Sequence, residues 1–168
     1  MWSKLEFGKH DGKTLPQVVL SDPDWFFWAI DNGVLDYTPP ALRAEAKDVL
    51  RKATRIKIAK PDPENWQVKY IMDPDGKFSR FEIVEATRHI HMGSSLTDSA
   101  THLDLSFVRR RNAYDKVGNR RMLQCFKHYY FQNASLTKRR CEGFFTDSKN
   151  FVKESRPRAA GQKTSNRR

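Results

Sequence analysis

The chain has 168 residues, of which 38% are hydrophobic, and it carries a formal net charge of +11 at pH 7. A chain of this length forms one domain of ordinary size or two small ones. No apolar run approaches the length of a membrane span, and residues 1–7 lack the apolar stretch and cleavage site of a signal peptide, so we expect a soluble, cytoplasmic protein. The two cysteines, Cys125 and Cys141, are too few for a disulfide framework and lack a zinc-binding spacing, so we expect reduced thiols and no cofactor.

A small helical lobe that begins with a β-turn is predicted for residues 1–60. A short strand is interrupted by Gly8 and Gly12, which permit the left-handed backbone angles of a tight turn. Thr14 and Asp22 are each followed within two residues by a proline. A capping side chain followed by proline is typical of the first turn of a helix, so we expect one helix after each of these residues.

Helical patterning continues to about residue 60 and stops at a linker. The second helix carries four consecutive aromatic residues, 25–28, which cannot all face inward, so one or two must pack on another lobe or on a partner. An apolar stripe predicts a third helix over 40–54. Because Pro-Asp-Pro at 61–63 is typical of a linker, we place a second domain at 61–152. Residues 153–168 contain no hydrophobic side chain larger than alanine and are expected to be a disordered basic tail.

The second domain is predicted to combine a sheet with two helices. Alternating apolar residues predict strands over 66–70 and 78–84, joined by an Asp-Pro-Asp-Gly turn, and a third strand over 103–107. Helical patterns follow over 119–132 and 136–147. We therefore expect an α+β fold in which a three-stranded antiparallel sheet is packed with two basic helices.

The positive charge is concentrated in the last third of the chain. Residues 101–168 hold 17 lysines and arginines against 5 aspartates and glutamates, whereas residues 1–60 hold 10 against 8 and residues 61–100 hold 4 against 7. Acidic residues are nearly absent between residues 105 and 146, so we expect no intramolecular neutralisation of these cations. Cations interleaved with aromatic rings suit phosphates and bases, so DNA or RNA is the partner we expect, bound without catalysis.

The cationic side of the helix over 119–132 is expected to form the binding surface together with its flanks. On a helical wheel, Met122 and Phe126 fall on the packing side, whereas Phe131 projects among the basic residues. Tyr114 and Phe131 are the expected stacking platforms. The residues predicted to contact nucleic acid in this part of the chain are Arg109, Arg110, Arg111, Tyr114, Lys116, Arg120, Arg121, Lys127, Phe131, Lys138, Arg139 and Arg140.

A family resemblance covers roughly residues 5–35. Residues 7–15 (Phe-Gly-Lys-His-Asp-Gly-Lys-Thr-Leu), followed by Val18 and by Asp-Pro-Asp-Trp-Phe-Phe-Trp at 22–28, resemble the small domain at the C-terminus of exodeoxyribonuclease X-like exonucleases. That domain also occurs as short stand-alone bacterial proteins. The resemblance implies a bacterial or mobile-element protein with an accessory module that helps to hold nucleic acid. It carries over no catalytic residue, because the exonucleases' acidic catalytic domain has no counterpart here. On the turn, cations and backbone N–H groups are predicted to meet a phosphate at Lys9, His10 and Lys13.

Two alternative functions stay open. The first is a protein-interaction factor, such as a phage or plasmid inhibitor or an accessory subunit, whose cationic face docks on an acidic or nucleic-acid-binding partner. The second is a metal-dependent nuclease, in which His89, His91 and His102 would hold the metal for phosphodiester hydrolysis. A histidine pair on a strand more often faces solvent or is satisfied locally, so we assign neither a metal nor a catalytic residue.

Overall fold

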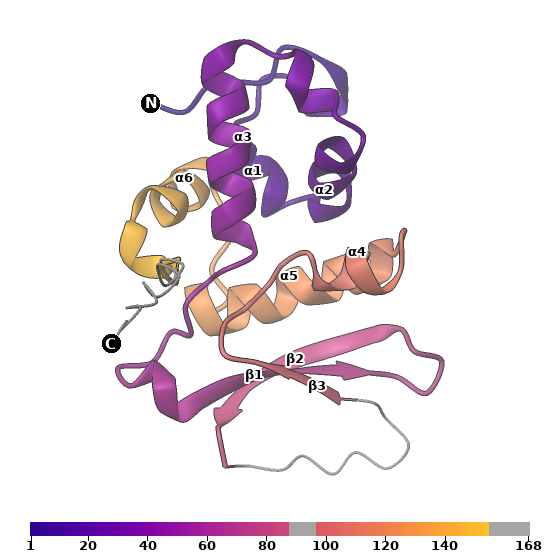
Figure 1. Cartoon of the computed structure of the whole chain (residues 1–168), viewed down its shortest axis with the longest axis vertical. Coiled ribbons are helices and arrows are strands. Elements are labelled where there is room, and N and C mark those ends of the chain that lie inside the picture. The colour runs from indigo at the N-terminus through magenta and orange to yellow at the C-terminus, as the bar shows by residue number, and fades with distance from the viewer. Residues whose placement is uncertain (88–96, 155–168) are drawn as a thin grey trace, which may run out of the picture.

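A helical layer lies on one face of a three-stranded antiparallel sheet in the computed structural model, of which we describe residues 1–87 and 97–154 (Figure 1). The outer helices are α1 (Leu15–Val19), α2 (Pro23–Asp31), α3 (Pro40–Ala53) and α6 (Lys138–Thr146). Two further helices lie between them and the sheet: α4 (Phe107–Arg111) and α5 (Lys116–Phe131). The strands are β1 (Trp66–Met72), β2 (Phe78–Glu85) and β3 (Thr97–Ala100), and short 3₁₀ turns occupy Gly8–His10, Val34–Tyr37, Pro63–Asn65 and Ser148–Asn150. This architecture confirms the predicted α+β class.

The N-terminal turn forms as its glycines predict. Gly8 and Gly12 have φ angles of +70° and +79°, in the left-handed region that glycine tolerates best. The turn closes on Leu5, whose N–H donates to the carbonyl of Lys13 at 2.9 Å and whose carbonyl accepts from Gly12 at 2.8 Å. One isolated bridge between the segments at 4 and 14 stands where we expected a short strand. The turn is therefore a closed loop of defined shape.

The predicted capping residues begin both helices that follow the turn. Thr14 forms a capping box with Gln17, whose side-chain oxygen accepts from the Thr14 N–H at 3.0 Å. Asp22 caps α2 by accepting from the backbone N–H of Trp25 at 3.1 Å. Asp22 also contacts Lys9 and His10 of the turn, so this cap holds the start of α2 next to the turn.

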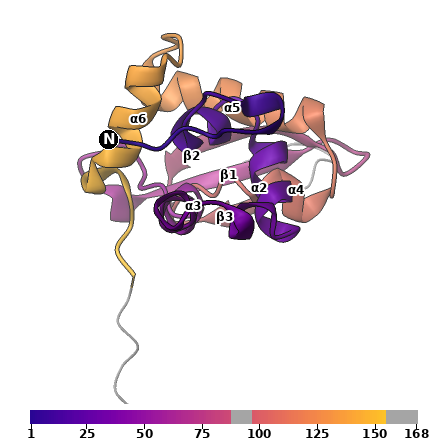
Figure 2. The same cartoon turned by 90° about the horizontal axis from the view of Figure 1, so that it is seen from above.

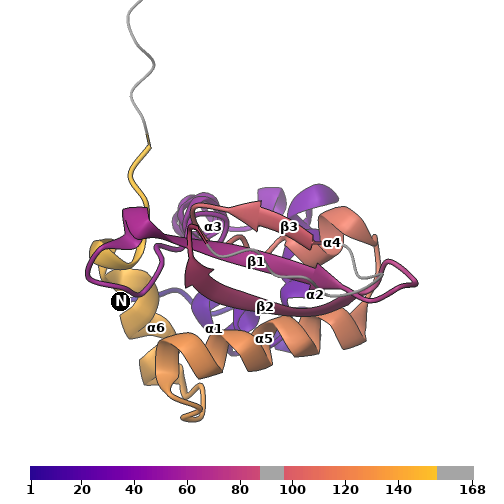
Figure 3. The ribbon, with the colours of Figure 1, turned by 90° about the horizontal axis from the view of Figure 1, so that it is seen from below.

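The predicted hairpin is confirmed, and β1 lies at the centre of the sheet. The strand order is β2-β1-β3, and Tyr70 of β1 lies opposite Phe81 of β2. The turn between them is held by Asp73, whose Oδ1 accepts from the N–H groups of Asp75 and Lys77 at 3.0 Å each. In the view from below, α5 runs along β2 (Figure 3).

The prediction of a third strand over 103–107 is wrong. The third strand is β3, an edge strand of sequence Thr-Asp-Ser-Ala, and a strand this exposed shows no apolar alternation. The alternating residues are three separate anchors instead. Leu103 exchanges backbone hydrogen bonds with Ile56 (2.8 and 2.9 Å), and the Leu105 N–H donates to the carbonyl of Ala53, the last residue of α3, at 3.0 Å. The ring of Phe107 stacks on that of Tyr70, with 3.9 Å between the centroids.

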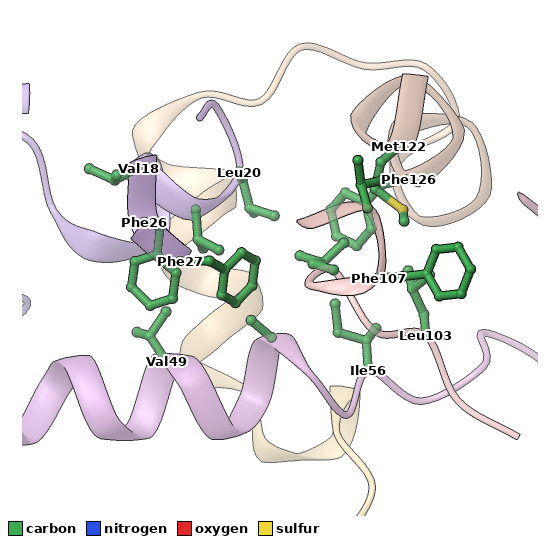
Figure 4. Packing of buried hydrophobic residues seen from close by; sticks show 14 of the residues in the cluster. Val18, Leu20, Phe26, Phe27, Val49, Ile56, Leu103, Phe107, Met122 and Phe126 are labelled. Carbon is green, nitrogen blue, oxygen red and sulfur yellow. The ribbon is translucent and has the colours of Figure 1, made fainter. Parts of the chain in front are cut away.

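The second helix on the sheet is α4, not α6 as we expected. Phe107 of α4 stacks on β1, whereas α6 packs against α1 in the outer layer. One buried hydrophobic cluster runs through both proposed domains, and Figure 4 shows Leu20 and Phe27 of the outer layer in the same cluster as Met122 and Phe126. The packing therefore does not divide at residue 60. Of the predicted tail, residues 155–168 lie outside the described residues.

Gly118 allows α4 and α5 to approach each other at the start of α5. Asp115 caps α5 by accepting from the Gly118 N–H at 2.8 Å. A Cβ atom at position 118 would lie 2.9 Å from a methyl carbon of Val108 and would overlap the Asp115 carboxylate. The close contact between the two helices therefore requires glycine here.

We expect Gly118→Ala to lower the free energy of unfolding by roughly 1–3 kcal/mol, because overpacking outweighs the higher helix propensity of alanine. Gly143→Ala in α6 is the matched control, because no described atom beyond its chain neighbours and the backbone of its own helix lies within 4 Å of the new Cβ. There we expect a gain of up to about 1 kcal/mol. Chemical denaturation measures both. An equal gain in the two variants would contradict the close approach of α4 and α5.

Candidate functional site

A groove of about 540 Å³ lies between the N-terminal turn, the start of α2 and the exposed side of α5. The N-terminal segment runs alongside α5 in the view from above (Figure 2). Residues about a hundred positions apart in the chain meet here, and six of them were predicted to contact nucleic acid: Lys9, His10, Lys13, Lys116, Arg120 and Lys127. We call this surface, with its five lysine and arginine side chains, the basic groove.

The three cations of α5 share one side of the helix. Arg120 and Lys127 follow Lys116 by 4 and 11 positions, and both spacings return to the same face at 3.6 residues per turn. Lys9 and Lys13 face them from the turn, because both line the same groove. Two rigid elements, a closed turn and a helix, thus hold the five cations around a concave surface.

Most of the groove cations lack an acidic partner. Within residues 1–87 and 97–154, Lys13, Arg120 and Lys127 form no ion pair. Lys116 lies over the ring of Tyr114, with its Nζ 5.7 Å from the ring centroid, and the contact with the tyrosine hydroxyl raises the pKa of this lysine. Of the five groove cations, Lys9 alone forms an ion pair in the described part of the chain, with Asp22 at 2.6 Å. The groove therefore has an excess of positive charge.

His10 and Asp22 form a pair at the groove wall. The Nε2 atom of His10 lies 3.0 Å from an oxygen of Asp22, and the ring stands edge-on to Trp25 at 5.0 Å between centroids. Burial lowers the pKa of His10 despite the opposing effect of Asp22, so burial favours the neutral imidazole. Although burial acts to raise it, hydrogen bonds from Lys9, Trp25 and His10 hold the pKa of Asp22 below its ordinary value. His10 is buried, so it positions the turn instead of reaching for a phosphate.

Two buried polar side chains that sequence reasoning missed also line the groove. Asp24 is 6% exposed and Asn119 is 4% exposed. Neither carboxylate oxygen of Asp24 and neither polar side-chain atom of Asn119 has a hydrogen-bond partner among the described residues. Burial raises the pKa of Asp24, against the opposing effect of Arg109. Unpartnered polar atoms are rare in protein interiors and concentrate where water or a ligand binds.

Two predicted arginines are neutralised by carboxylates, contrary to our expectation. Arg109 pairs with Asp31 at 2.8 Å and Arg110 pairs with Asp104 at 2.7 Å. Both acidic residues lie outside the stretch between 105 and 146 in which we expected few acids. These two arginines of α4 therefore contribute little free positive charge.

The other predicted cations lie away from the basic groove. Arg121 points toward the sheet and donates to the carbonyl of Phe78 at 3.3 Å. On α6, Arg140 donates to the carbonyl of Ser135 at 2.7 Å, whereas Lys138 and Arg139 line a separate cavity of about 600 Å³. Arg111 is exposed at the end of α4 and does not line the groove. The predicted cluster over 109–140 is thus divided among several faces.

The two predicted stacking platforms differ. Tyr114 is 66% exposed. Phe131 is half-buried, with its ring centroid 5.6 Å from that of Phe126 and 5.7 Å from that of Phe144. The expectation that Phe131 projects among the basic residues is therefore wrong, because the end of α5 turns this ring toward α6.

The described residues contain no group of three histidine, cysteine, aspartate or glutamate side chains that could hold a metal ion. Of the three alternative ligands, His102 lies with its Nδ1 3.4 Å from the Thr101 hydroxyl, and His89 and His91 fall outside the described residues. Cys125 and Cys141 are free, and burial raises the pKa of both thiols. None of the helices in the described ranges is both long and apolar enough to cross a bilayer.

Comparison with known proteins finds no matching family model, no matching curated protein and no matching solved structure. The resemblance of residues 5–35 to the exonuclease-associated domain therefore stays a prediction. The function has to be argued from the basic groove itself.

We expect Asp24→Asn to raise the free energy of unfolding at pH 7 and to leave it almost unchanged near pH 4. The pKa of the folded carboxyl lies above that of the unfolded chain, so ionisation at higher pH favours unfolding, and the amide removes this penalty. Urea denaturation between pH 4 and pH 8 measures the difference.

Asp22→Asn gives the opposite sign and serves as the contrasting variant. The pKa of Asp22 is lowered in the folded state, so its charge stabilises the fold above the pKa of the unfolded chain, and losing that charge is expected to destabilise. A loss of stability at neutral pH in Asp24→Asn as well would show that the buried carboxylate has a partner.

Proposed function

We propose that this protein binds nucleic acid without catalysis, and that the phosphates bind in the basic groove. The observation that supports this proposal is the meeting of two cationic segments, the N-terminal turn and one side of α5, around one concave surface. Concave surfaces lined by one sign of charge focus the electrostatic field and attract ligands of the opposite sign.

The charge balance of the groove favours a polyanion over a small neutral ligand. Five cations face two carboxyl groups. Of those two, Asp22 already contacts Lys9 and His10 and caps α2. Burial disfavours the ionised form of the other, Asp24. A phosphate chain would supply the counter-charges that Lys13, Arg120 and Lys127 lack within the described fold. Binding would release condensed counterions, which is the main source of affinity in such contacts.

The arrangement also favours a sequence-independent mode of binding. Lysine and arginine on a groove wall contact phosphates, which carry no sequence information, whereas base reading needs side chains aimed at base edges. The three α5 cations extend over about 16 Å of helix, at 1.5 Å per residue. That length suits a short stretch of nucleic acid backbone.

We expect the double variant R120E/K127E to lower the affinity for a fluorescein-labelled oligonucleotide at least about tenfold at 0.1 M salt, because two phosphate contacts become repulsive. The matched control is R111E/R139E, which changes the net charge equally at two exposed positions outside the groove. Fluorescence anisotropy measures both affinities. Equal losses would mean that only net charge matters, and unchanged binding by R120E/K127E would favour an acidic protein partner for the groove.

The logarithm of the affinity is expected to fall linearly with the logarithm of salt concentration. If all five groove cations contact phosphates, the slope reaches about −3.5 on a single strand and about −4.5 on a duplex. R120E/K127E should reduce the magnitude of the slope by roughly 1.4 to 1.8, whereas R111E/R139E should leave it unchanged. Titrations at four or more salt concentrations measure these slopes, and a flat dependence in the unmodified protein would contradict phosphate binding.

A further inference from the structure

An aromatic cavity of about 430 Å³ continues the basic groove past the start of α2. Lys9, Asp22, Asp24 and Lys116 line both, so the two cavities join. The walls that the second cavity adds come from two short stretches of chain, one on α2 and one before α5: Trp25, Trp28, Arg109, Ala113 and Tyr114.

Two aromatic rings of this cavity are exposed. Trp28 is 43% exposed and Tyr114 is 66% exposed. Tryptophan and tyrosine usually bury their rings, so two exposed rings in one cavity next to lysines call for a ligand with flat faces. The sequence predicted that one or two of the four consecutive aromatic residues would pack on another lobe or on a partner, and Trp28 is the exposed one of the four.

Trp28 rests on a rigid support. The centroid of its ring lies 6.4 Å from that of Trp25, one helical turn earlier on α2. Trp25 is in turn fixed by Phe7 at 6.5 Å and by His10 at 5.0 Å. A stacking platform needs such support, because a ring that is already ordered loses little conformational entropy when a base binds.

We propose that the nucleic acid bound in the groove is single-stranded, with unpaired bases stacked on Trp28 and Tyr114. This inference rests on the proposed function, because the phosphates of the same strand would pass Lys9 and Lys116 and continue toward Arg120. Base stacking on aromatic side chains beside cations is the general means of binding single strands without reading their sequence. A duplex keeps its bases stacked inside the helix and presents no free base face to Trp28.

The relative affinity for a single strand and a duplex tests this inference, because phosphate contacts alone predict that the duplex binds at least as tightly. A duplex has the higher charge density, so a purely electrostatic groove binds it at least as tightly as a single strand. We expect a 20-nucleotide oligodeoxythymidine to bind at least about tenfold more tightly than a 20-base-pair duplex of mixed sequence, with stacking as the source. Anisotropy titrations in one buffer at one salt concentration compare the two.

Variants of the two rings test the stacking directly. Trp28→Ala and Tyr114→Ala are each expected to lower the affinity for oligodeoxythymidine by about five- to a hundredfold, to leave duplex affinity within about twofold, and to preserve the salt slope. Trp28→Phe should keep most of the affinity because it keeps a stacking face. The control is Tyr37→Ala, another exposed aromatic residue that lines neither cavity, and circular dichroism melting checks that each variant is folded.

Intrinsic fluorescence gives a second readout that a structural defect would not mimic. A base stacked on Trp28 quenches its emission, so oligodeoxythymidine should quench the unmodified protein and quench Trp28→Phe much less at saturation. Equal or tighter duplex binding with no effect of the ring variants would overturn the single-strand inference and leave phosphate binding in place, provided that R120E/K127E still weakens binding. Absence of binding to either probe would overturn both proposals.

Discussion

One shared hydrophobic core holds the outer helices against α5, and the basic groove depends on this contact. Bringing Lys9 and Lys13 toward Arg120 and Lys127 is electrostatically unfavourable, yet two unit charges 4 Å apart in water cost only about 1 kcal/mol. Burying one leucine or phenylalanine side chain contributes roughly 1.5–3 kcal/mol, and the cluster that joins the layers contains many of them. Apolar burial therefore outweighs the repulsion and keeps like charges together on one concave surface.

Ile56, which follows α3, is a buried residue of this core at which distant segments of the chain meet. Its N–H and carbonyl bond to Leu103, and it also forms a bridge to Phe151. Segments around residues 56, 103 and 151 thus meet at one buried residue. The strong local patterns of the sequence could not reveal this meeting, because each of its bonds joins residues that lie far apart.

Local signals were predictable, whereas long-range ones were not. Thr14, Asp22 and the glycines of the turn act through neighbours within a few residues, so their roles follow from the sequence. The ion pair between Arg109 and Asp31 joins residues 78 positions apart, and the local sequence of α4 does not predict it. The third strand was missed for a different reason, since β3 is mostly exposed and its sequence has no alternating apolar pattern. The groove cations were predicted individually, but only the fold shows that turn and helix share a surface.

Hydrogen bonding is incomplete at two buried polar side chains that line the basic groove. Asp24 and Asn119 line the groove beside its cations, and their buried polar side-chain atoms have no hydrogen-bond partner within residues 1–87 and 97–154. Such groups reduce stability, and they persist most often where a site requires polar atoms that are not already engaged. The aromatic cavity adds the complementary feature, because Trp28 exposes apolar surface that would stabilise the fold if it were buried.

The position of Phe151 bears on how the protein is made. This residue and α6 complete the core around α1, with Lys52 donating to the carbonyl of Phe145 at 2.8 Å and Trp2 to the hydroxyl of Thr146 at 3.1 Å. During translation α1 and α3 leave the ribosome well before α6 and Phe151, so part of their apolar surface stays exposed to solvent in the meantime. The part of the core that α6 and Phe151 cover can therefore close only after α6 has left the exit tunnel.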